Sequence, residues 1–182
     1  MITGFSGFVS SYLLDYLSSR GTSIDIIGIS REDVQPVKYP NLNIKTYKGN
    51  LIDASFVKDV IAATKPDYII HLAAYSSVAY SWKFPVDSFR NNTNIFLNVI
   101  ESVRLLSLPT KILSIGSSEE YGIVKEKDLP IKETLFPNPI NPYAIARVSQ
   151  EMLGKLYTRD YGLDIVMTRS FNHFGPKQRA DF

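Results

Sequence analysis

The segment Thr3-Gly-Phe-Ser-Gly-Phe-Val-Ser10 lies almost at the start of the chain and indicates which fold to expect. In a dinucleotide-binding fold, an apolar strand runs into a glycine turn, and the next helix holds a pyrophosphate at its N-terminus. Gly4 and Gly7 stand where the turn is tight and the backbone must approach the phosphates. Ser10 replaces the usual third glycine and is small enough for close packing. Only two residues precede this stretch, too few for a normal strand, so either the first strand is short or residues before it are missing.

Strands and helices alternate along the rest of the chain. Apolar runs of strand length predict strands over Ile24–Ser30, Asn43–Tyr47, Tyr68–Leu72, Lys111–Ile115 and Leu163–Arg169. Helical spacing predicts a helix that follows the glycine turn through Leu13, Leu14 and Leu17 and ends near Gly21. Further helices are predicted over Ala54–Thr64, Pro85–Ser107 and Asn141–Tyr161. The proline-rich stretch 130–142 is expected to be a loop. This alternation predicts an α/β protein with a Rossmann-type, doubly wound parallel sheet.

The composition is that of an ordinary globular domain. Of 182 residues, 45% are hydrophobic and 21% are charged, which suffices for one domain with its own core. The net charge of +2 is small and dispersed, so we expect neither nucleic acid nor an anionic membrane as partner. Cysteine is absent and no apolar run reaches the length of a membrane span. We therefore expect a soluble, cytoplasmic protein.

Two histidines, His71 and His173, lie far apart in the sequence, and with no cysteine present we predict no metal site. His71 lies within an apolar run and is expected to be a core residue. Ala73 and Ala74 follow that run. Such small residues at the end of a strand would let a flat cofactor lie close to the backbone.

The end of the second predicted strand bears on the choice of cofactor. An acidic residue there would bind the ribose 2′-hydroxyl of NAD, whereas an arginine can bind the 2′-phosphate of NADP. Here the strand ends at Ser30 and Arg31 follows. We therefore favour NADP(H), while NAD(H) stays open because Arg31 could equally be solvated.

A tyrosine and a cation share one face of the helix predicted over Asn141–Tyr161. In Tyr143-Ala-Ile-Ala-Arg147 the two side chains are four residues apart and therefore adjacent. The positive charge favours the phenolate, which lets Tyr143 exchange a proton near neutral pH. A serine hydroxyl from the segment 112–117 could share the substrate oxygen with the phenol. A tyrosine on a helix is usually structural, so the motif gains its weight from the glycine turn upstream.

Together these motifs resemble those of the extended short-chain dehydrogenase/reductases, in the branch that modifies nucleotide sugars. The segment TGFSGFVS resembles the cofactor loop of that family, GNLID at 49–53 its adenine-contacting turn, and HLAA at 71–74 the end of its fourth strand. The segments GSSEEYG at 116–122, PYAIAR at 142–147 and RSFNHFGP at 169–176 resemble its catalytic and substrate segments. The resemblance spans the whole chain.

The resemblance implies roles for individual residues. Ser117 matches the catalytic Ser or Thr, Tyr143 the catalytic acid, and Arg147 the position of the family's lysine. An arginine there can bind ribose and stabilise the phenolate, but it stays protonated and cannot join a proton relay. The implied cofactor-binding residues are Gly4, Phe5, Ser6, Gly7, Phe8, Ser30, Arg31, Asn50, Leu51, Leu72, Ala73, Ala74, Tyr143 and Arg147. The implied substrate-binding residues are Ser76, Ser118, Glu119 and Asn172.

The resemblance also implies an activity. The segments 71–82, 115–122 and 168–176 are most similar to those of enzymes that use NAD(P)H to reduce the C4 ketone of a GDP-4-keto-6-deoxyhexose. The alternative is 4,6-dehydration of GDP-mannose, because Glu119 stands where a dehydratase base would be. A third reading, a nucleotide-binding module without catalysis, is favoured by Arg147 in place of lysine. Family members continue with a small domain that closes over the sugar, and residues 1–182 are not expected to include it.

An oligomeric state is implied as well. The helix predicted over Pro85–Ser107 has a wider apolar face than one sheet can cover. Together with the habit of the family, this predicts a homodimer. In such a dimer, the helices predicted over Pro85–Ser107 and Asn141–Tyr161 of both subunits form a four-helix bundle.

Overall fold

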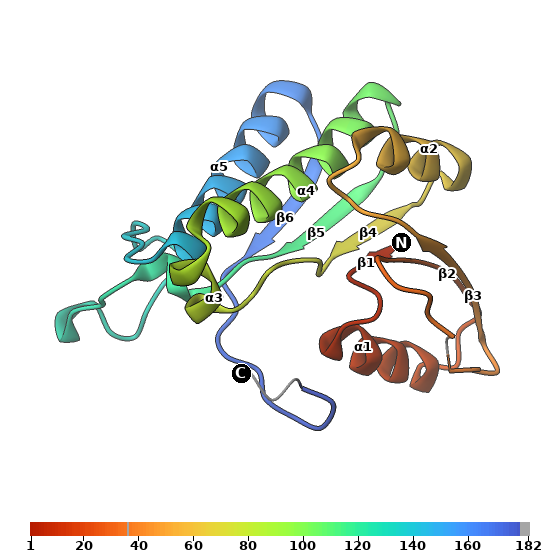
Figure 1. Cartoon of the computed structure of the whole chain (residues 1–182), viewed down its shortest axis with the longest axis horizontal. Coiled ribbons are helices and arrows are strands. Elements are labelled where there is room, and N and C mark those ends of the chain that lie inside the picture. Colours follow the sequence, from red (N-terminus) through yellow and green to blue (C-terminus); the bar gives the residue numbers. More distant parts are fainter. Residues whose placement is uncertain (36, 179–182) are drawn as a thin grey trace.

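A parallel sheet with strand order β3-β2-β1-β4-β5-β6 forms the centre of the computed structural model (Figure 1), which describes residues 1–35 and 37–178. All of its neighbouring strands are parallel. This is the order of the doubly wound dinucleotide-binding fold, in which the topology switches between β1 and β4. The predicted fold class is confirmed. The strands are β1 (Ile2–Thr3), β2 (Ile24–Ser30), β3 (Leu42–Lys48), β4 (Tyr68–His71), β5 (Lys111–Ile115) and β6 (Asp164–Thr168).

Helices cover both faces of the sheet (Figure 1). Helix α1 packs on one face, and α2, α4 and α5 pack on the other. None of the helices within the described ranges has the length and apolar character needed to span a membrane. The helices are α1 (Phe8–Ser19), α2 (Ala54–Thr64), α3 (Val78–Lys83), α4 (Pro85–Leu105) and α5 (Pro142–Tyr161), with 3₁₀ turns η1 (Ser118–Tyr121) and η2 (Glu126–Asp128).

The larger core cluster lies between the sheet and α2, α4 and α5. Phe96, Val99 and Ile100 of α4 are fully buried against Ile69 of β4 and Ile112 of β5. Burying each such side chain contributes about 1.5–3 kcal/mol. The apolar spacing of α4 therefore fixes this helix over the strands that carry the candidate site. A smaller cluster forms between α1 and the β1–β2–β3 side of the sheet.

Local signals set several element boundaries. Asp53 caps α2 by accepting hydrogen bonds from the N–H groups of Ser55 and Phe56, at 3.0 and 3.1 Å. Asn141 caps α5 rather than forming its first residue, and accepts from the Ala144 N–H at 2.8 Å. Strand β1 has only two residues.

The structure differs from the predicted elements in several places, and the differences at the carboxyl edge of the sheet bear on the site. Strand β4 ends at His71 and not at Leu72. The short helix α3, which Ser77 caps, and the turn η1 follow β4 and β5 in stretches where the sequence predicted no regular structure. Both lie at the carboxyl edge of the sheet, where serine side chains cap short helical turns.

Candidate active site

The backbone of the glycine turn lies very close to the connection that follows β4. Gly4 has a φ of 69°, and a Cβ atom on it would lie 2.8 Å from the Ala73 nitrogen. The Gly7 N–H closes the turn by donating to the Gly4 carbonyl at 2.9 Å. Gly4 is therefore required both by the left-handed conformation and by lack of space. Ala73, half-buried, is the small residue that this approach needs.

The N-terminus of α1 is suited to hold a diphosphate. Its N-cap is Gly7, which makes no side-chain cap, and its first turn contains no acidic residue. The first N–H groups of a helix have no partner within the helix, and the helix dipole adds positive potential there. Ser10 is fully buried, as expected for the small third residue of the motif. These features fit the pyrophosphate of a dinucleotide.

Phe5 builds this loop rather than facing the groove. Its ring is 4% exposed, and a Cβ atom on Gly28 would lie 2.5 Å from it. The Phe5 N–H donates to the Ile29 carbonyl at 3.0 Å and is thus already bonded. Of the loop residues predicted to bind cofactor, Ser6 and Gly7 are exposed and Phe8 is half-buried at the start of α1.

At the end of β2, Arg31 reaches across the carboxyl edge of the sheet. Its Nη1 donates to the Tyr75 hydroxyl at 3.0 Å, and its guanidinium carbon lies 5.3 Å from the centre of that ring. Tyr75 follows β4, on the other side of β1 from β2. Next to Arg31, the Ser30 hydroxyl donates to the Ser6 hydroxyl at 3.1 Å and so ties β2 to the glycine turn.

The predicted adenine turn is held by α4. Asn98, which the sequence did not reveal, donates from Nδ2 to the carbonyls of Leu51 and Ile52 at 2.8 and 3.0 Å. Asn50 is exposed, and its Oδ1 accepts from the Ile52 N–H at 3.1 Å. Leu51 is buried in the core. The side-chain oxygen expected to face adenine therefore already stabilises the turn, although a carbonyl can accept a second bond.

Ser117 lies just beyond β5 and caps η1. Its side chain accepts from the Glu119 N–H at 3.2 Å, and its N–H donates to Oε1 of Glu120 at 2.8 Å. The residue is 9% exposed. Because the hydroxyl oxygen already accepts a bond, the hydroxyl proton stays available for donation to a substrate oxygen.

Tyr143 and Arg147 are in contact on α5, as their spacing predicted. The guanidinium carbon lies 5.1 Å from the centre of the Tyr143 ring, and both residues are nearly buried. Arg147 Nη1 donates to the Ile115 carbonyl at 3.1 Å and to Oε1 of Gln150 at 2.8 Å. Gln150 in turn donates to the Asn92 carbonyl of α4 at 2.7 Å. This network anchors the cation at the end of β5.

Asn141 links the helix of Tyr143 to the segment of Ser117. Its Nδ2 donates to Oε2 of Glu119 at 2.8 Å, while its Oδ1 caps α5. The Asn-Pro pair at 141–142 is a signal for a helix start, but nothing in the sequence indicates the contact with Glu119. The structure thereby brings Glu119 to the start of the helix that carries Tyr143.

The other predicted substrate residues make no hydrogen bond to Ser117 or Tyr143 within the described part of the chain. The Ser118 N–H donates to the Ser170 carbonyl at 2.8 Å. Ser76 and Asn172 are exposed. Asn172 lies in the stretch that leaves β6 and reaches α1, where the Tyr12 hydroxyl donates to the Pro176 carbonyl at 3.2 Å (Figure 1).

His71 is a core residue, as predicted. It is fully buried, its Nδ1 lies 3.0 Å from the Thr3 hydroxyl, and its ring centre lies 5.5 Å from that of Phe96. Burial, together with the positive charge of Arg147, lowers the pKa of His71 to about 3. The imidazole is therefore neutral in the folded protein at physiological pH.

The strand order, the glycine turn and the Ser–Tyr–Arg arrangement define a protein of the extended short-chain dehydrogenase/reductase class. The model of the family described as GDP-mannose 4,6 dehydratase matches residues 1–182. The chain belongs to this family.

Known proteins similar to the chain differ in the reactions their names describe. The GDP-6-deoxy-D-mannose reductase of Pseudomonas aeruginosa is 30% identical over 100% of this chain and 54% of its own length. Among solved structures, RMD from Pseudomonas aeruginosa complexed with NADPH has a TM-score of 0.80 at 28% identity, over 100% of this chain and 56% of that one. The UDP-glucose 4-epimerase of Thermus thermophilus in complex with NAD has a TM-score of 0.83 at 28% identity, over 98% and 56%. The chain spans about half the length of the curated relatives it matches.

Proposed function

We propose that the protein uses NAD(P)H to reduce the C4 ketone of a GDP-linked 4-keto-6-deoxyhexose. The observation that carries this proposal is the contact of Tyr143 with the Arg147 guanidinium at the sheet edge that also bears the glycine turn. The similarity to the GDP-6-deoxy-D-mannose reductase, which is 30% identical over 100% of this chain, supports the choice of substrate.

The mechanism assigns one task to each residue. The glycine turn and the N-terminus of α1 bind the pyrophosphate, and the nicotinamide cofactor, when bound, supplies the hydride. Ser117 donates its hydroxyl proton in a hydrogen bond to the ketone oxygen, and Tyr143 protonates that oxygen as negative charge develops on it. Arg147 stabilises the resulting phenolate and binds ribose. Because a guanidinium keeps its proton, Tyr143 must be reprotonated by another route than Arg147.

NADP(H) is the proposed cofactor. Arg31 is exposed at the end of β2, where a 2′-phosphate would lie, and its contact with the Tyr75 hydroxyl is a single hydrogen bond that a phosphate can replace. Since one similar structure carries NADPH and another carries NAD, the choice rests on Arg31.

A dehydratase is the second candidate function, and the position of Glu119 favours it. Removal of water needs a carboxylate to abstract the C5 proton and to protonate the departing hydroxide. Asn141, two residues before Tyr143, holds Glu119 beside the start of α5 through a hydrogen bond. The family model that matches the chain also bears the name of this activity.

Product analysis separates the candidates. Incubation with a GDP-4-keto-6-deoxyhexose and NADPH should consume NADPH and yield the GDP-6-deoxyhexose. Loss of water from GDP-mannose without net cofactor consumption would establish the dehydratase instead. Binding of NADPH without turnover of either sugar would favour a nucleotide-binding module. Residues 1–182 supply the nucleotide-binding and catalytic side of the site in this proposal, and a further domain closes over the sugar.

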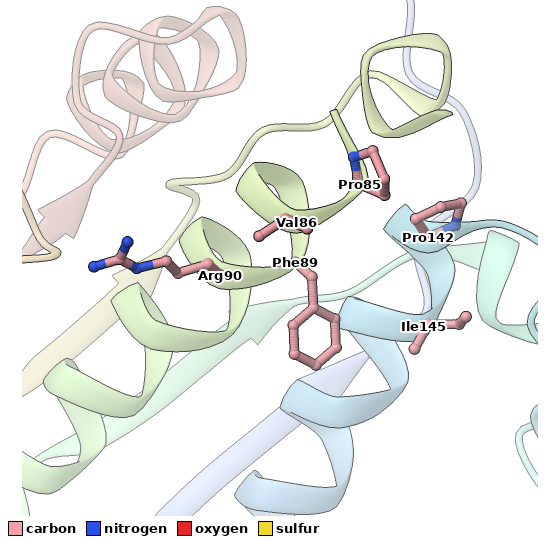
Figure 2. Close-up of a pocket in the computed structure, with 6 residues that line it drawn as sticks. All are labelled: Pro85, Val86, Phe89, Arg90, Pro142 and Ile145. Carbon is pink, nitrogen blue, oxygen red and sulfur yellow. The ribbon is translucent and has the colours of Figure 1, made fainter. Parts of the chain in front are cut away.

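A homodimer through α4 and α5 is part of the proposal. Exposed apolar side chains of both helices surround a shallow hollow, drawn in Figure 2, which is lined by Pro85, Val86, Phe89, Arg90, Pro142 and Ile145. Val86 is 79% exposed, and farther along α5 Met152 is 58% exposed. Light scattering at micromolar concentration should give twice the monomer mass, and a charge at the centre of this face, Ile145→Glu, should halve it. A monomer mass for the wild type would refute the dimer.

A further inference from the structure

A cluster of buried charged side chains packs against the segment that carries Ser117. Glu120 of η1, Glu151 of α5 and Arg169, which follows β6, form what we call the carboxylate–guanidinium cluster. Their side chains are 1%, 8% and 8% exposed. Burying ionisable groups is unfavourable unless each is paired and hydrogen-bonded. The contacts of the cluster indicate what it stabilises.

Glu120 contacts the Ser117 backbone directly. Its Oε1 accepts the Ser117 N–H at 2.8 Å, while the Ser117 side chain accepts from the Glu119 N–H, and together these bonds form a capping box around η1. A glutamine could accept the same bond without bringing a charge into the interior. A turn of four residues does not by itself call for a buried carboxylate.

Arg169 holds the other side of Glu120. It donates to both carboxylate oxygens of Glu151 at 2.7 Å and to the Leu135 carbonyl at 2.9 Å. Its Nε lies 3.9 Å from Oε2 of Glu120, an ion pair longer than a hydrogen bond. The guanidinium carbon also lies 4.7 Å from the centre of the Tyr121 ring. Arg169 is thus fixed on several sides and offers Glu120 a stationary positive charge.

The end of β6 holds the same backbone from the opposite direction. The Ser118 N–H donates to the Ser170 carbonyl at 2.8 Å, and the Ser170 hydroxyl donates to the Gly116 carbonyl at 3.0 Å. A Cβ atom on Gly116 would lie 2.5 Å from Oε1 of Glu120. The backbone from Gly116 to Ser118 is therefore enclosed between Glu120 and the residues that follow β6.

We propose that Glu120 is a positioning residue that orients the Ser117 backbone, and with it the Ser117 hydroxyl, toward the carbonyl oxygen of the substrate. Arg169 and Glu151 keep Glu120 in place. The inference rests on the proposed function, because that function makes Ser117 the group that polarises the ketone.

The charges around Glu120 make the strength of its hydrogen bond with the Ser117 N–H depend on pH. Burial raises the pKa of Glu120, and the nearby Glu151 carboxylate raises it further, while the Ser117 N–H and Arg169 oppose the shift. Hydrogen bonds from Arg169 lower the pKa of Glu151, which Lys155 also contacts from the solvent side. Glu120 is therefore the carboxylate that takes up a proton first. Once neutral, it accepts the Ser117 N–H less strongly.

Backbone NMR of the protein tests this without any turnover. The Ser117 amide proton should shift with pH, with a midpoint above the usual glutamate range, and Glu120→Gln should abolish that titration while keeping the amide protected from exchange. In Glu120→Ala the Ser117 amide should exchange roughly tenfold faster or more. An amide that does not titrate in the wild type, or that titrates equally in Glu120→Gln, overturns the proposal. That comparison decides even if Glu120→Ala fails to fold.

Kinetics supply the second readout. Glu120→Ala should lower kcat for ketone reduction roughly tenfold or more with the KM for cofactor unchanged, and Glu120→Gln should restore most of it. Glu126→Ala, an exposed glutamate of η2, is the control. A wild-type kcat in folded Glu120→Ala overturns the positioning role. If the amide behaves as predicted and no ketone is reduced, the proposed function fails while the hold of Glu120 on Ser117 stands.

Discussion

The two halves of the carboxyl edge of the sheet bury different kinds of polar residue. On the half that we propose binds the cofactor, called the cofactor half and formed by β1, β2 and α1, the buried polar residues are the hydroxyl residues Thr3, Ser10 and Ser30. On the half that we propose carries out proton transfer, called the catalytic half and formed by β5, β6, η1 and α5, charged Glu120, Arg147 and Glu151 are buried.

Each half fixes the positions of its groups in a different way. A diphosphate is bound by N–H groups and a helix dipole, so the cofactor half needs small residues and close backbone approach. Proton transfer needs a phenol, a hydroxyl and a cation at fixed positions, so the catalytic half depends on side-chain networks. Substitutions should therefore act through sterics in the first half and through charge and hydrogen bonds in the second.

The largest effect is expected from Gly4→Ala in the cofactor half. The left-handed conformation costs a non-glycine residue about 1–2 kcal/mol, and overlap with packed backbone adds about 1–3 kcal/mol. Gly21→Ala is the matched control, because Gly21 has a φ of 72° but no atom within 4 Å of its Cβ position. Urea unfolding should show a larger loss for Gly4→Ala, accompanied by weaker cofactor binding. Equal losses would refute the steric account.

Arg31→Ala should weaken the binding of NADPH by about 1.5–3 kcal/mol, because a charge-assisted hydrogen bond to the 2′-phosphate is lost. Binding of NADH should hardly change. Tyr75→Phe, which removes the hydroxyl that Arg31 contacts and leaves the arginine, should preserve the preference for NADPH. Calorimetric titration with both cofactors measures the difference, and equal weakening of the two would defeat the NADP(H) assignment.

His71 should make the folded protein less stable in acid, whereas Glu120, whose pKa burial raises, contributes in the opposite direction. Burial holds the folded pKa of His71 near 3, whereas the unfolded side chain titrates near 6.5, so below that pH the unfolded state binds an extra proton. The contribution of His71 is complete above pH 6.5 and declines by about 1.4 kcal/mol per pH unit down to the folded pKa. Between pH 6.5 and 5.0 the loss is about 2 kcal/mol.

His71→Asn removes this titration, so its change in stability between pH 6.5 and 5.0 should differ from that of the wild type by this amount. Denaturant unfolding at both pH values makes the comparison. A His71→Asn slope identical to that of the wild type would show that the buried imidazole does not titrate as described.

The smallest effect is expected from Arg147→Lys. An ammonium cannot keep the geometry of the bonds to both Ile115 and Gln150, so about 1 kcal/mol of stability should be lost. Ketone reduction should be retained or raised, whereas Arg147→Ala should lose both turnover and the ribose contact. Arg159→Lys, exposed on the same helix, serves as control. Steady-state rates in which the lysine variant is as inactive as the alanine variant would contradict the role of the cation.

The sequence predicted the cofactor half better than the catalytic half, for a physical reason. Gly4, Gly7 and Ser10 act through local backbone geometry, and their spacing along the chain is itself the signal. The contact of Tyr143 with Arg147 was equally readable, because it is local to one helix. By contrast, Glu120 meets Arg169 only through the pairing of β5 with β6, and Asn98 reaches Leu51 across the fold. Such contacts have no spacing in the sequence from which they could be predicted.

The proposed proton transfer from Tyr143 in ketone reduction can be tested by measuring the rate of Tyr143→Phe with a GDP-4-keto-6-deoxyhexose and NADPH. Loss of the proton donor should lower kcat roughly 10²–10⁴-fold while the cofactor Kd stays nearly unchanged. Tyr161→Phe, exposed at the end of the same helix, should react like the wild type. A Tyr143→Phe variant that reduces the ketone as fast as the wild type would contradict the mechanism.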